Sequence, residues 1–494
     1  MTDNKVTFSN WQKGQTKHPI NGNGLLRNVE VFENPGIVKL QPRSVLDSTI
    51  TPTALPLAEE IDKYGNVYIA TGETGQGTIY KNGVSIQSSL SNVWDIKVYN
   101  DYLWVRHGTV VSAYGPLNNS PQWFGNVITN LESSYKGVML VGQDSKVYIT
   151  NGNNIFAFTA TGGTPAVAPV ATPSAGSGSN ALDLPDNDIA TCLAELGSNL
   201  MIGTGQGGSY VEIKNNRSAK IYPWDRASTS FRLPVVLNEK GVHQMLSFAN
   251  KLYVVAGTIG NIYESDSVNY RKIATLPYTV SNYTGFIEYF PNAIALSDRG
   301  TLLVGVSVGS DGVSKAGVYE INLNDPNYPV ALSRTISTGN MTSTSGRISI
   351  GYISSKTSGN VLGNIGWRDV NTFGVDNTSN VFLYPNYAGV IETELKIVGS
   401  HDHKRSFQYI QFLLSDPLVS GQSIRISYRT DSKSSYTLIS PTNEWSYSTV
   451  GGLLSFTDKV GIKDAILLQL KIELNQSTST VYGNNISLIS VSLW

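Results

Sequence analysis

The chain has 494 residues, 40% of them hydrophobic and 15% charged, and its 36 Lys and Arg against 37 Asp and Glu give a net charge of -1. This length is enough for two or three domains. The even charge balance disfavours direct recognition of duplex DNA, which needs a basic face. The single cysteine, Cys192, excludes a disulfide framework and a multi-cysteine zinc site.

Residues 1–45 have no counterpart elsewhere in the chain. We expect an N-terminal arm that contributes one or two strands, joined at the Asn34-Pro35-Gly36 turn. The arm lacks the apolar core of a signal peptide. No stretch of the sequence approaches the ~18 apolar residues of a membrane span. We therefore expect a protein made in the cytoplasm, without a membrane-spanning segment.

Residues 46–388 contain strands in groups of three or four, each group about 40 to 50 residues long. Hydrophobic residues alternate with a period of two, which is the pattern of half-buried strands. We count about six or seven groups, and this number of four-stranded sheets closes well into a β-propeller. The dipeptides Asn82-Gly83 and Asp311-Gly312 predict tight hairpin turns, because both residues of such a turn need a positive φ.

Two stretches of this region depart from the pattern. Residues 160–187 are of low complexity and cannot build a core of their own. They form either a flexible insertion between blades or a loop that lies on a neighbouring subunit. Residues 238–250 are a weak helix candidate.

Residues 389–494 carry seven or eight short alternating strands with the spacing of a β-sandwich. The clearest strand is Leu468–Leu474, in which four apolar side chains share one face and three polar ones share the other. Ser423–Arg429 repeats this alternation. The predicted fold class is therefore all-β, a β-propeller of about six or seven blades followed by a β-sandwich.

Glycine-rich motifs occur twice, as GETGQG at 72–77 and GTGQGG at 203–208. A dinucleotide-binding loop must open a helix, but a strand pattern follows each of these motifs. We interpret both as turns between strands and expect no cofactor. Six acids could reach the centre of a propeller, as glycosidase carboxylates do, although this holds for acids of any propeller: Asp95, Glu195, Asp225, Glu264, Asp266 and Glu288. Without a recognisable catalytic motif, the chain is predicted not to be an enzyme.

Metal sites have two weak candidates. His401 and His403 would share a face if they lay on a strand, but no third ligand is apparent and polar turn residues flank them. Asp369-Val370-Asn371 and Asp376-Asn377 could offer oxygen ligands to calcium, and Asx turns explain them equally well. We expect no metal.

Aromatic side chains could bind sugars by stacking on exposed ring faces. The candidates for such glycan stacking are Trp104, Trp123 and Trp224, and tryptophans at these positions could instead pack in the core.

Two stretches resemble structural proteins of tailed-phage particles. LRNVEVFENPGIVKLQPRS, residues 26–44, resembles a strand pair that precedes a propeller in phage virion proteins. Residues 391–431, with the run PLVSGQSIRISYRTD, resemble the C-terminal sandwich of similar proteins. The segment between them is similar to the propellers of tail-nozzle or hub proteins of short-tailed phages.

This resemblance implies a structural subunit of a viral tail, located in the virion. Its expected partners are copies of itself in a cyclic oligomer, with six-fold symmetry favoured, and other tail proteins such as an adaptor, fibres or spikes. Transient contact with exiting DNA is also implied. The alternatives are a receptor-binding or glycan-binding tail protein and a propeller carbohydrate-active enzyme.

Overall fold

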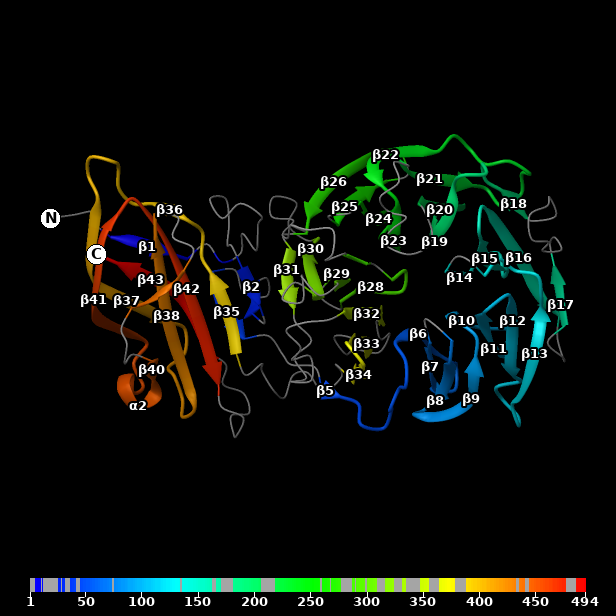
Figure 1. Ribbon diagram of the computed structural model, residues 1–494, viewed down its shortest axis with the longest axis horizontal. Coiled ribbons are helices and arrows are strands. Elements are labelled where there is room, and N and C mark those ends of the chain that lie inside the picture. Colours follow the sequence, from blue (N-terminus) through cyan, green and yellow to red (C-terminus); the bar gives the residue numbers. More distant parts are fainter. Residues whose placement is uncertain are drawn as a thin grey trace.

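The structure is a computed structural model, and Figure 1 shows its elements in chain order. It describes residues 5–9, 11, 25–27, 29–31, 36–40, 45–72, 75–133, 136–161, 166–169, 181–205, 218–257, 260–266, 268–276, 287–288, 290–297, 300–308, 316–323, 331–334, 347–354, 364–377, 388–431, 435–439, 444–476 and 486–494. The described chain is all-β, with many small antiparallel sheets and a short helix, α2 (Tyr447–Val450).

Five small sheets follow one another along the chain, each with its strands paired in sequence order. Sheet 1 holds β6 (Pro56–Ile61), β7 (Val67–Thr71), β8 (Gly77–Lys81) and β9 (Val84–Leu90). Sheet 2 holds β10 (Val93–Tyr99), β11 (Tyr102–His107), β12 (Val110–Gly115) and β13 (Gln122–Ile128). Sheet 3 holds β14 (Met139–Val141), β15 (Val147–Asn151), β16 (Asn154–Thr161) and β17 (Ala166–Pro169), with β18 (Leu182–Asp183) also on β16.

Sheets 4 and 5 repeat this arrangement. Sheet 4 holds β19 (Ile189–Leu196), β20 (Asn199–Gly205), β21 (Ser218–Trp224) and β22 (Val235–Lys240). Sheet 5 holds β23 (Val242–Phe248), β24 (Lys251–Ala256), β25 (Asn261–Ser265) and β26 (Tyr270–Thr275). Residues 238–250 therefore do not form a helix, because the alternating residues of β22 and β23 pair with β21 and β24 instead.

Sheets 6 and 7 are parts of one continuously paired sheet that extends into the second lobe, and Val308 of sheet 6 pairs with Ile348 of sheet 7. Both parts recruit strands from the N-terminal segment. Sheet 6 holds β28 (Ile294–Leu296), β29 (Thr301–Val308), β30 (Gly317–Asn322) and β31 (Ala331–Arg334), with β27 (Ile287–Glu288) also on β29. Sheet 7 holds β32 (Ile348–Ile353), β33 (Asn364–Asp369) and β34 (Thr372–Asn377), and its fourth strand is β5 (Val45–Leu46). A strand from the start of the described chain thus completes a sheet that is otherwise built 300 residues later.

The first strands of the seven sheets are neighbours in space. β6 contacts β10, β10 contacts β14, β19 contacts both β14 and β23, β23 contacts β28, β28 contacts β32, and β32 contacts β6. Figure 1 shows these strands facing the middle of one lobe, with the later strands of each sheet further out. Separate hydrophobic cores lie between neighbouring sheets, as in the cluster formed by sheets 4 and 5.

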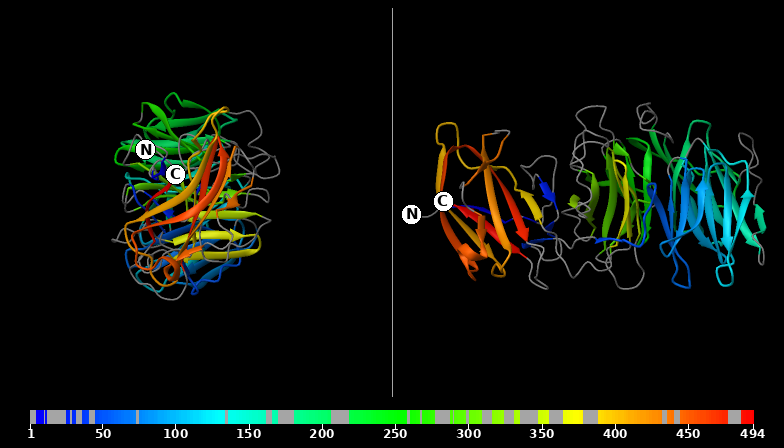
Figure 2. Two further views of the ribbon diagram at one scale, coloured as in Figure 1. Left: turned by 90° about the vertical axis from the view of Figure 1, so that its left-hand side faces the viewer. Right: turned by 60° about the horizontal axis from the view of Figure 1, so that its bottom comes forward.

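The remaining strands form two sheets that enclose one core in the second lobe (Figure 2). One contains β3 (Val29–Glu30), β4 (Val38–Leu40), β43 (Ser487–Leu493), β37 (Arg405–Leu414) and β41 (Ser455–Ala465), with β1 (Val6–Phe8) also on β43. The other contains β39 (Thr437–Leu438), β38 (Gln422–Thr430), β42 (Leu467–Gln476), β35 (Ala388–Glu392) and β2 (Leu25–Arg27), with β36 (Lys396–Ile397) on β42 and β40 (Glu444–Ser446) on β38. We call this pair of sheets the two-sheet module.

The strand patterns of this module behave as the sequence predicts. In β42, Leu468, Leu470, Ile472 and Leu474 are all fully buried in the common core. Gln469 on the opposite face of β42 is buried as well. Its side-chain amide donates to the Thr393 carbonyl and its side-chain oxygen accepts from Arg429, so its polar groups have partners although they are buried.

One predicted hairpin turn is confirmed. Asn82 and Gly83 join β8 to β9 with φ values of 47° and 82°, so both lie in the left-handed region. Asp311-Gly312 lies outside the described residues. The low-complexity stretch 160–187 is not wholly an insertion, because its residues Ala166–Pro169 pair with β16 as β17. Pairing with an existing strand satisfies its backbone without a core of its own.

Candidate functional site

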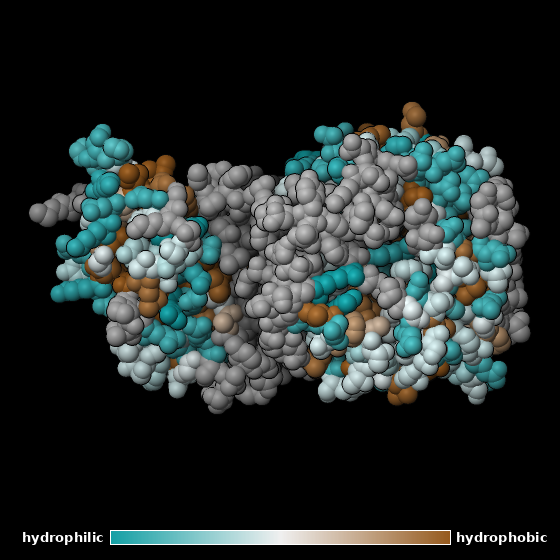
Figure 3. All heavy atoms as spheres, in the orientation of Figure 1, coloured by the Kyte–Doolittle hydropathy of each residue, from teal (hydrophilic) through white to brown (hydrophobic). Residues whose placement is uncertain are grey.

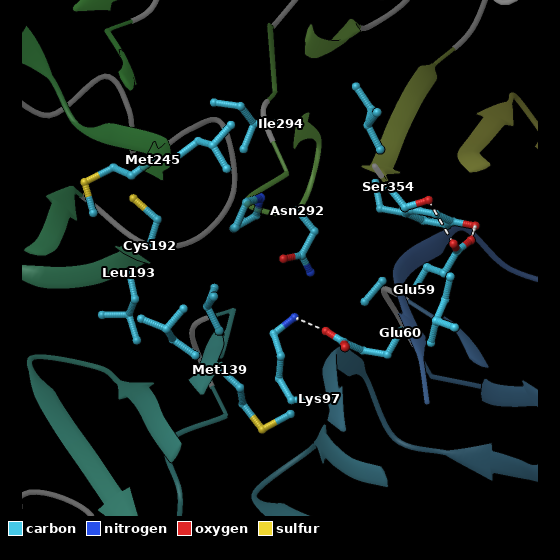
Figure 4. Close-up of a pocket in the computed structure, with 18 residues that line it drawn as sticks. Glu59, Glu60, Lys97, Met139, Cys192, Leu193, Met245, Asn292, Ile294 and Ser354 are labelled. Carbon is cyan, nitrogen blue, oxygen red and sulfur yellow. Dashed lines mark hydrogen bonds and ion pairs between the residues drawn. The ribbon is translucent and has the colours of Figure 1, made fainter. Parts of the chain in front are cut away.

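A cavity of about 370 Å³ lies where the first strands of the sheets meet. Figure 4 shows side chains from several of these strands pointing into one space. Its lining comes from β6, β10, β14, β19, β23, β28 and β32 and from the residues beside them. The cavity has a polar wall and an apolar wall.

Lys97 is the centre of the polar wall. Its ammonium group lies 2.8 Å from Glu60 Oε1 on β6 and 3.5 Å from Asp95 Oδ1, two residues earlier on β10. The Lys97 side chain keeps 19% of its exposure, whereas Asp95 keeps none. Burial raises the pKa of Asp95, and the Lys97 charge opposes that rise. Burial lowers the pKa of Lys97, but the charges of Asp95 and Glu60 outweigh this effect and raise the pKa above its ordinary value.

Asp95 is held by donors from three separate parts of the chain. Its Oδ1 accepts the Ile96 N–H at 2.9 Å, and its Oδ2 accepts the Met139 N–H from β14 at 2.8 Å. The Asn292 side-chain amide also donates to Oδ1, at 3.1 Å. A carboxylate without water contact needs such donors to remain ionised. Asp95 therefore joins sheets 2 and 3 to the segment that precedes β28.

That segment, Phe290–Ala293, reaches several first strands, and we call it the crossing segment. Asn292 donates to the Leu57 carbonyl of β6 at 3.2 Å as well as to Asp95, and its own carbonyl accepts the Ile353 N–H of β32. Gln244 of β23 donates to the carbonyls of both Phe290 and Ala293. The crossing segment is thus hydrogen-bonded to sheets 1, 2, 5 and 7.

Glu59 forms a second polar cluster at the junction of sheets 1 and 7. Its carboxylate accepts hydrogen bonds from Tyr352 Oη at 3.0 Å, Ser354 Oγ at 2.8 Å and Asn364 Nδ2 at 2.6 Å. All three donors belong to sheet 7 or directly follow its first strand. Burial, followed by the Glu59 charge, raises the pKa of Tyr352 well above its ordinary value, so the phenol stays a donor.

The apolar wall faces these groups. It is formed by Met139, Leu193, Met245 and Ile294, which come from four different sheets. Cys192 lies beside them, and burial raises the pKa of its thiol to about 12. A thiol with that pKa stays protonated at neutral pH and is a poor nucleophile.

Two of the three predicted glycan-stacking residues are not exposed. Trp104 is fully buried 4.8 Å from the Phe158 ring centroid, and its indole N–H donates to the Tyr99 carbonyl. Trp224 is buried as well, and it meets Tyr148 edge-on. Both positions correct the sequence interpretation, because a buried ring offers no face to a sugar. Trp123 is half-buried near the His107 ring and stays a candidate.

The metal candidates do not converge on one point. His401 and Asp402 are exposed in a turn rather than on a strand, so His401 and His403 share no strand face. Asp369 pairs opposite Thr372, at the end of the β33–β34 hairpin where Val370 turns with a φ of 54°. Asp376 lies towards the hairpin's other end and accepts the Trp367 indole N–H. Among the described residues, no group of three or more His, Cys, Asp or Glu could hold an ion.

The other sequence motifs lie away from the cavity or outside the described chain. Gly203–Gly205 end β20, and residues 206–208 of the same motif are outside the described residues. Of the six acids expected near the centre, Asp95 lies beside the cavity, and Glu195 and Glu264 form ion pairs elsewhere. Within the described part of the chain, no helix is long and apolar enough to cross a membrane.

Most residues of the polar wall were not predicted from the sequence. Glu59, Glu60, Lys97, Asn292 and Tyr352 are spread over nearly 300 residues and share no motif. A usable signal was their position on or beside the first strand of a predicted blade. Such a position brings a charged side chain towards the centre where the first strands meet.

Comparison with known proteins leaves the family open. No known protein family and no curated protein matches the sequence. Among solved structures, the chain is similar to the extracellular domain of a hybrid two-component system protein from B. thetaiotaomicron, with a TM-score of 0.45, 14% identity and coverage of 90% of this chain and 57% of that one. It is also similar to the extracellular domain of a one-component system protein from the same organism, with a TM-score of 0.41, 12% identity and coverage of 85% and 47%.

A third similar structure is a catalytically inactive virginiamycin B lyase from Staphylococcus aureus, with a TM-score of 0.41, 11% identity and coverage of 69% of this chain and 98% of that one. The chain spans about half the length of the first two structures. Similarity at this level does not transfer function between proteins.

Proposed function

We propose that this chain is a non-enzymatic structural protein of a tailed-phage particle, in which a closed seven-bladed β-propeller and a β-sandwich form one rigid ring subunit. The observation that carries the proposal is the meeting of the two phage-like stretches in one module. Residues 26–44 and 391–431 are far apart in sequence, yet Leu26 of β2 pairs with Ile391 of β35. The resemblance therefore covers one folded unit, the two-sheet module, rather than two unrelated fragments.

Closure of the propeller is supported by the contacts between its first and last sheets. β6 of sheet 1 contacts β32 of sheet 7, and Glu59 accepts three hydrogen bonds across that junction. β5 supplies the outer strand of sheet 7, where Asp47 N donates to the Val375 carbonyl at 2.8 Å. A ring of this kind leaves only short sheet edges and resists shear.

The N-terminal arm supports rigidity between the two lobes. β2 pairs with β35 of the two-sheet module and, in parallel, with β31 of sheet 6 through Arg27 and Ser333. The same arm then supplies β5 to sheet 7. One short segment is thus hydrogen-bonded to both lobes, which suits a subunit that carries mechanical load.

The described surface is suited to hydrated interfaces between subunits. On the face drawn in Figure 3, hydrophobic residues of the described surface occur as separate patches among polar ones. Interfaces of ordinary assemblies have this mixed polarity. A cyclic ring, with six-fold symmetry favoured, would bury such faces repeatedly.

The central cavity cannot be the genome conduit in this proposal. A cavity of 370 Å³ is at the small end of the range for small-molecule pockets, so it cannot hold a DNA duplex, whose major groove alone is ~12 Å wide. The crossing segment also spans the centre. Exiting DNA would therefore pass through the bore between subunits, and the adaptor and fibres or spikes would bind the ring from outside.

The assembly proposal is tested on the purified full chain and on particles. Sedimentation velocity and electron microscopy should show a ring of several copies, and mass spectrometry should find the chain in purified virions. A chain that stays monomeric and is absent from virions would overturn the proposal. Release of reducing sugar from host polysaccharide would favour the enzyme alternative instead.

Closure is tested separately in the full chain with Asp47→Pro, which removes the N–H that donates to the Val375 carbonyl beside the β5–β34 pairing. Asp47→Ala keeps this N–H and is the matched control. Hydrogen exchange in β34 should be faster in Asp47→Pro than in Asp47→Ala, because only the proline variant weakens the pairing to Val45 and Leu46. Equal exchange in β34 would show that β5 does not complete the seventh blade.

A further inference from the structure

Some polar side chains that line the central cavity can accept further hydrogen bonds, beyond those that they make to described residues. Lys97 uses two of its three ammonium hydrogens on Glu60 and Asp95, and Asn292 uses both of its amide hydrogens on Leu57 and Asp95. The Asn292 side-chain oxygen and the second carboxylate oxygen of Glu60 accept no hydrogen bond within the described part of the chain. Two acceptors are therefore available at the polar wall.

The charge of the polar wall is negative. Glu59 and Glu60 bring two carboxylates to the lining of the cavity, and Lys97 brings one ammonium group. The apolar wall adds no charge. The apolar wall has a low dielectric constant and focuses the field of these charges, so a cation is attracted and an anion is repelled.

The apolar wall offers an adaptable surface opposite these acceptors. Met139 and Met245 are unbranched and polarizable, and they lie with Leu193 and Ile294 around the space (Figure 4). Pockets of about 300 to 1,000 Å³ with an apolar lining and a few polar groups are typical sites for small molecules. The 370 Å³ cavity is at the small end of that range.

We propose that this cavity binds a small organic cation, namely a primary alkylammonium ion with an aliphatic body. The ammonium group donates to Glu60 and to the Asn292 side-chain oxygen. The aliphatic body lies against Met139, Met245 and Leu193. This binding depends on the sheets around the cavity and not on assembly into a phage tail.

The test uses the full chain labelled with ¹³C at its methionine methyl groups. Hexylamine is titrated at neutral pH and compared with hexanoate, which has the same body and the opposite charge, and with neutral 1-hexanol. The methyl signals of Met139 and Met245 should move, whereas that of Met201, which is fully buried in the core between sheets 4 and 5, should not. We expect at least tenfold tighter binding of hexylamine than of hexanoate.

Two variants separate charge recognition from simple filling of the space. Glu60→Gln should weaken hexylamine at least fivefold and leave 1-hexanol nearly unchanged, and the control Asp402→Asn removes an exposed charge without effect. Leu193→Phe should reduce the binding of both molecules by filling the apolar wall. Equal affinity for hexylamine and hexanoate, or wild-type affinity in Glu60→Gln, would overturn the proposal.

Discussion

Asn292 donates its side-chain amide to Asp95 across 197 residues of sequence, at a distance of 3.1 Å. The same amide donates to the Leu57 carbonyl, so one side chain joins the crossing segment to sheets 1 and 2. Asp95 is completely buried, so the loss of the Asn292 donor leaves it with one hydrogen bond fewer and no water to replace that bond.

Asn292→Ala should lower the free energy of unfolding by about 2–3 kcal/mol, because two hydrogen bonds to buried acceptors are lost. Chemical denaturation followed by tryptophan fluorescence measures this change. Asn118→Ala, at an exposed position, is the matched control and should have almost no effect. Equal stability of the two variants would show that the crossing segment is held by its backbone bonds alone.

Lys97→Ala should destabilise the protein by about 2–4 kcal/mol, because Glu60 and Asp95 lose the ammonium group that compensates them. This expected loss of stability is smaller than that for breaking a fully buried ion pair, because the Lys97 side chain keeps some exposure to solvent. Added butylamine should raise the melting temperature of the variant more than that of the wild type, since it restores the missing charge. Lys251→Ala, with an exposed side chain, should show no such rescue.

Stability should fall as the pH is lowered from about 6.5 to about 4, in part because of His107. Burial and, second, the neighbouring Arg106 charge lower the pKa of His107 to about 4. The unfolded chain takes up a proton near the ordinary value of 6.5, whereas the folded chain does not. Acid therefore favours the unfolded state in this window, by up to about 3 kcal/mol for this group.

His107→Gln should make the stability curve flatter between pH 6.5 and 4, whereas His401→Gln at an exposed position should leave its slope unchanged. Urea denaturation at a series of pH values measures both slopes. The prediction fails if His107→Gln and the wild type lose stability in parallel.

Gly83→Ala should destabilise more than Gly65→Ala, although both glycines have φ values near 83°. At position 65 the added methyl group meets nothing within 4 Å, so the cost is the backbone strain of about 1 kcal/mol. At position 83 it would also lie 2.8 Å from the Thr49 carbonyl oxygen. Thermal melts of the two variants should therefore differ by several degrees, and identical melts would contradict this contact.

The sequence was sufficient to predict features that depend only on residues close together in the chain. The alternation of Leu468–Leu474 predicted β42, and Asn82-Gly83 predicted the turn between β8 and β9. Local patterns set the direction of side chains along a strand and the φ values of a turn. The all-β class of the chain could be predicted on that basis.

The candidate site could not be predicted in the same way. Glu60, Lys97 and Asn292 meet only because separate sheets place their first strands around one centre. Nothing near Trp104 or Trp224 in the sequence distinguishes a buried ring from an exposed one, since either would suit a strand. The short apolar run in residues 238–250 is compatible with the period of a helix and with that of a strand. Pairing with β21 and β24 makes these residues parts of β22 and β23.

The pairing of Val6 with Leu493 sets a condition on synthesis. β1 and β4 both pair with β43, so these early strands remain without their partner until the ribosome has made residues 487–493. Translation that stops before residue 487 would release a polypeptide in which β1 and β4 lack β43 and part of the common core is exposed. Only products that include residues 487–493 can complete this sheet, so cellular quality-control proteases can recognise shorter copies by the core that they expose.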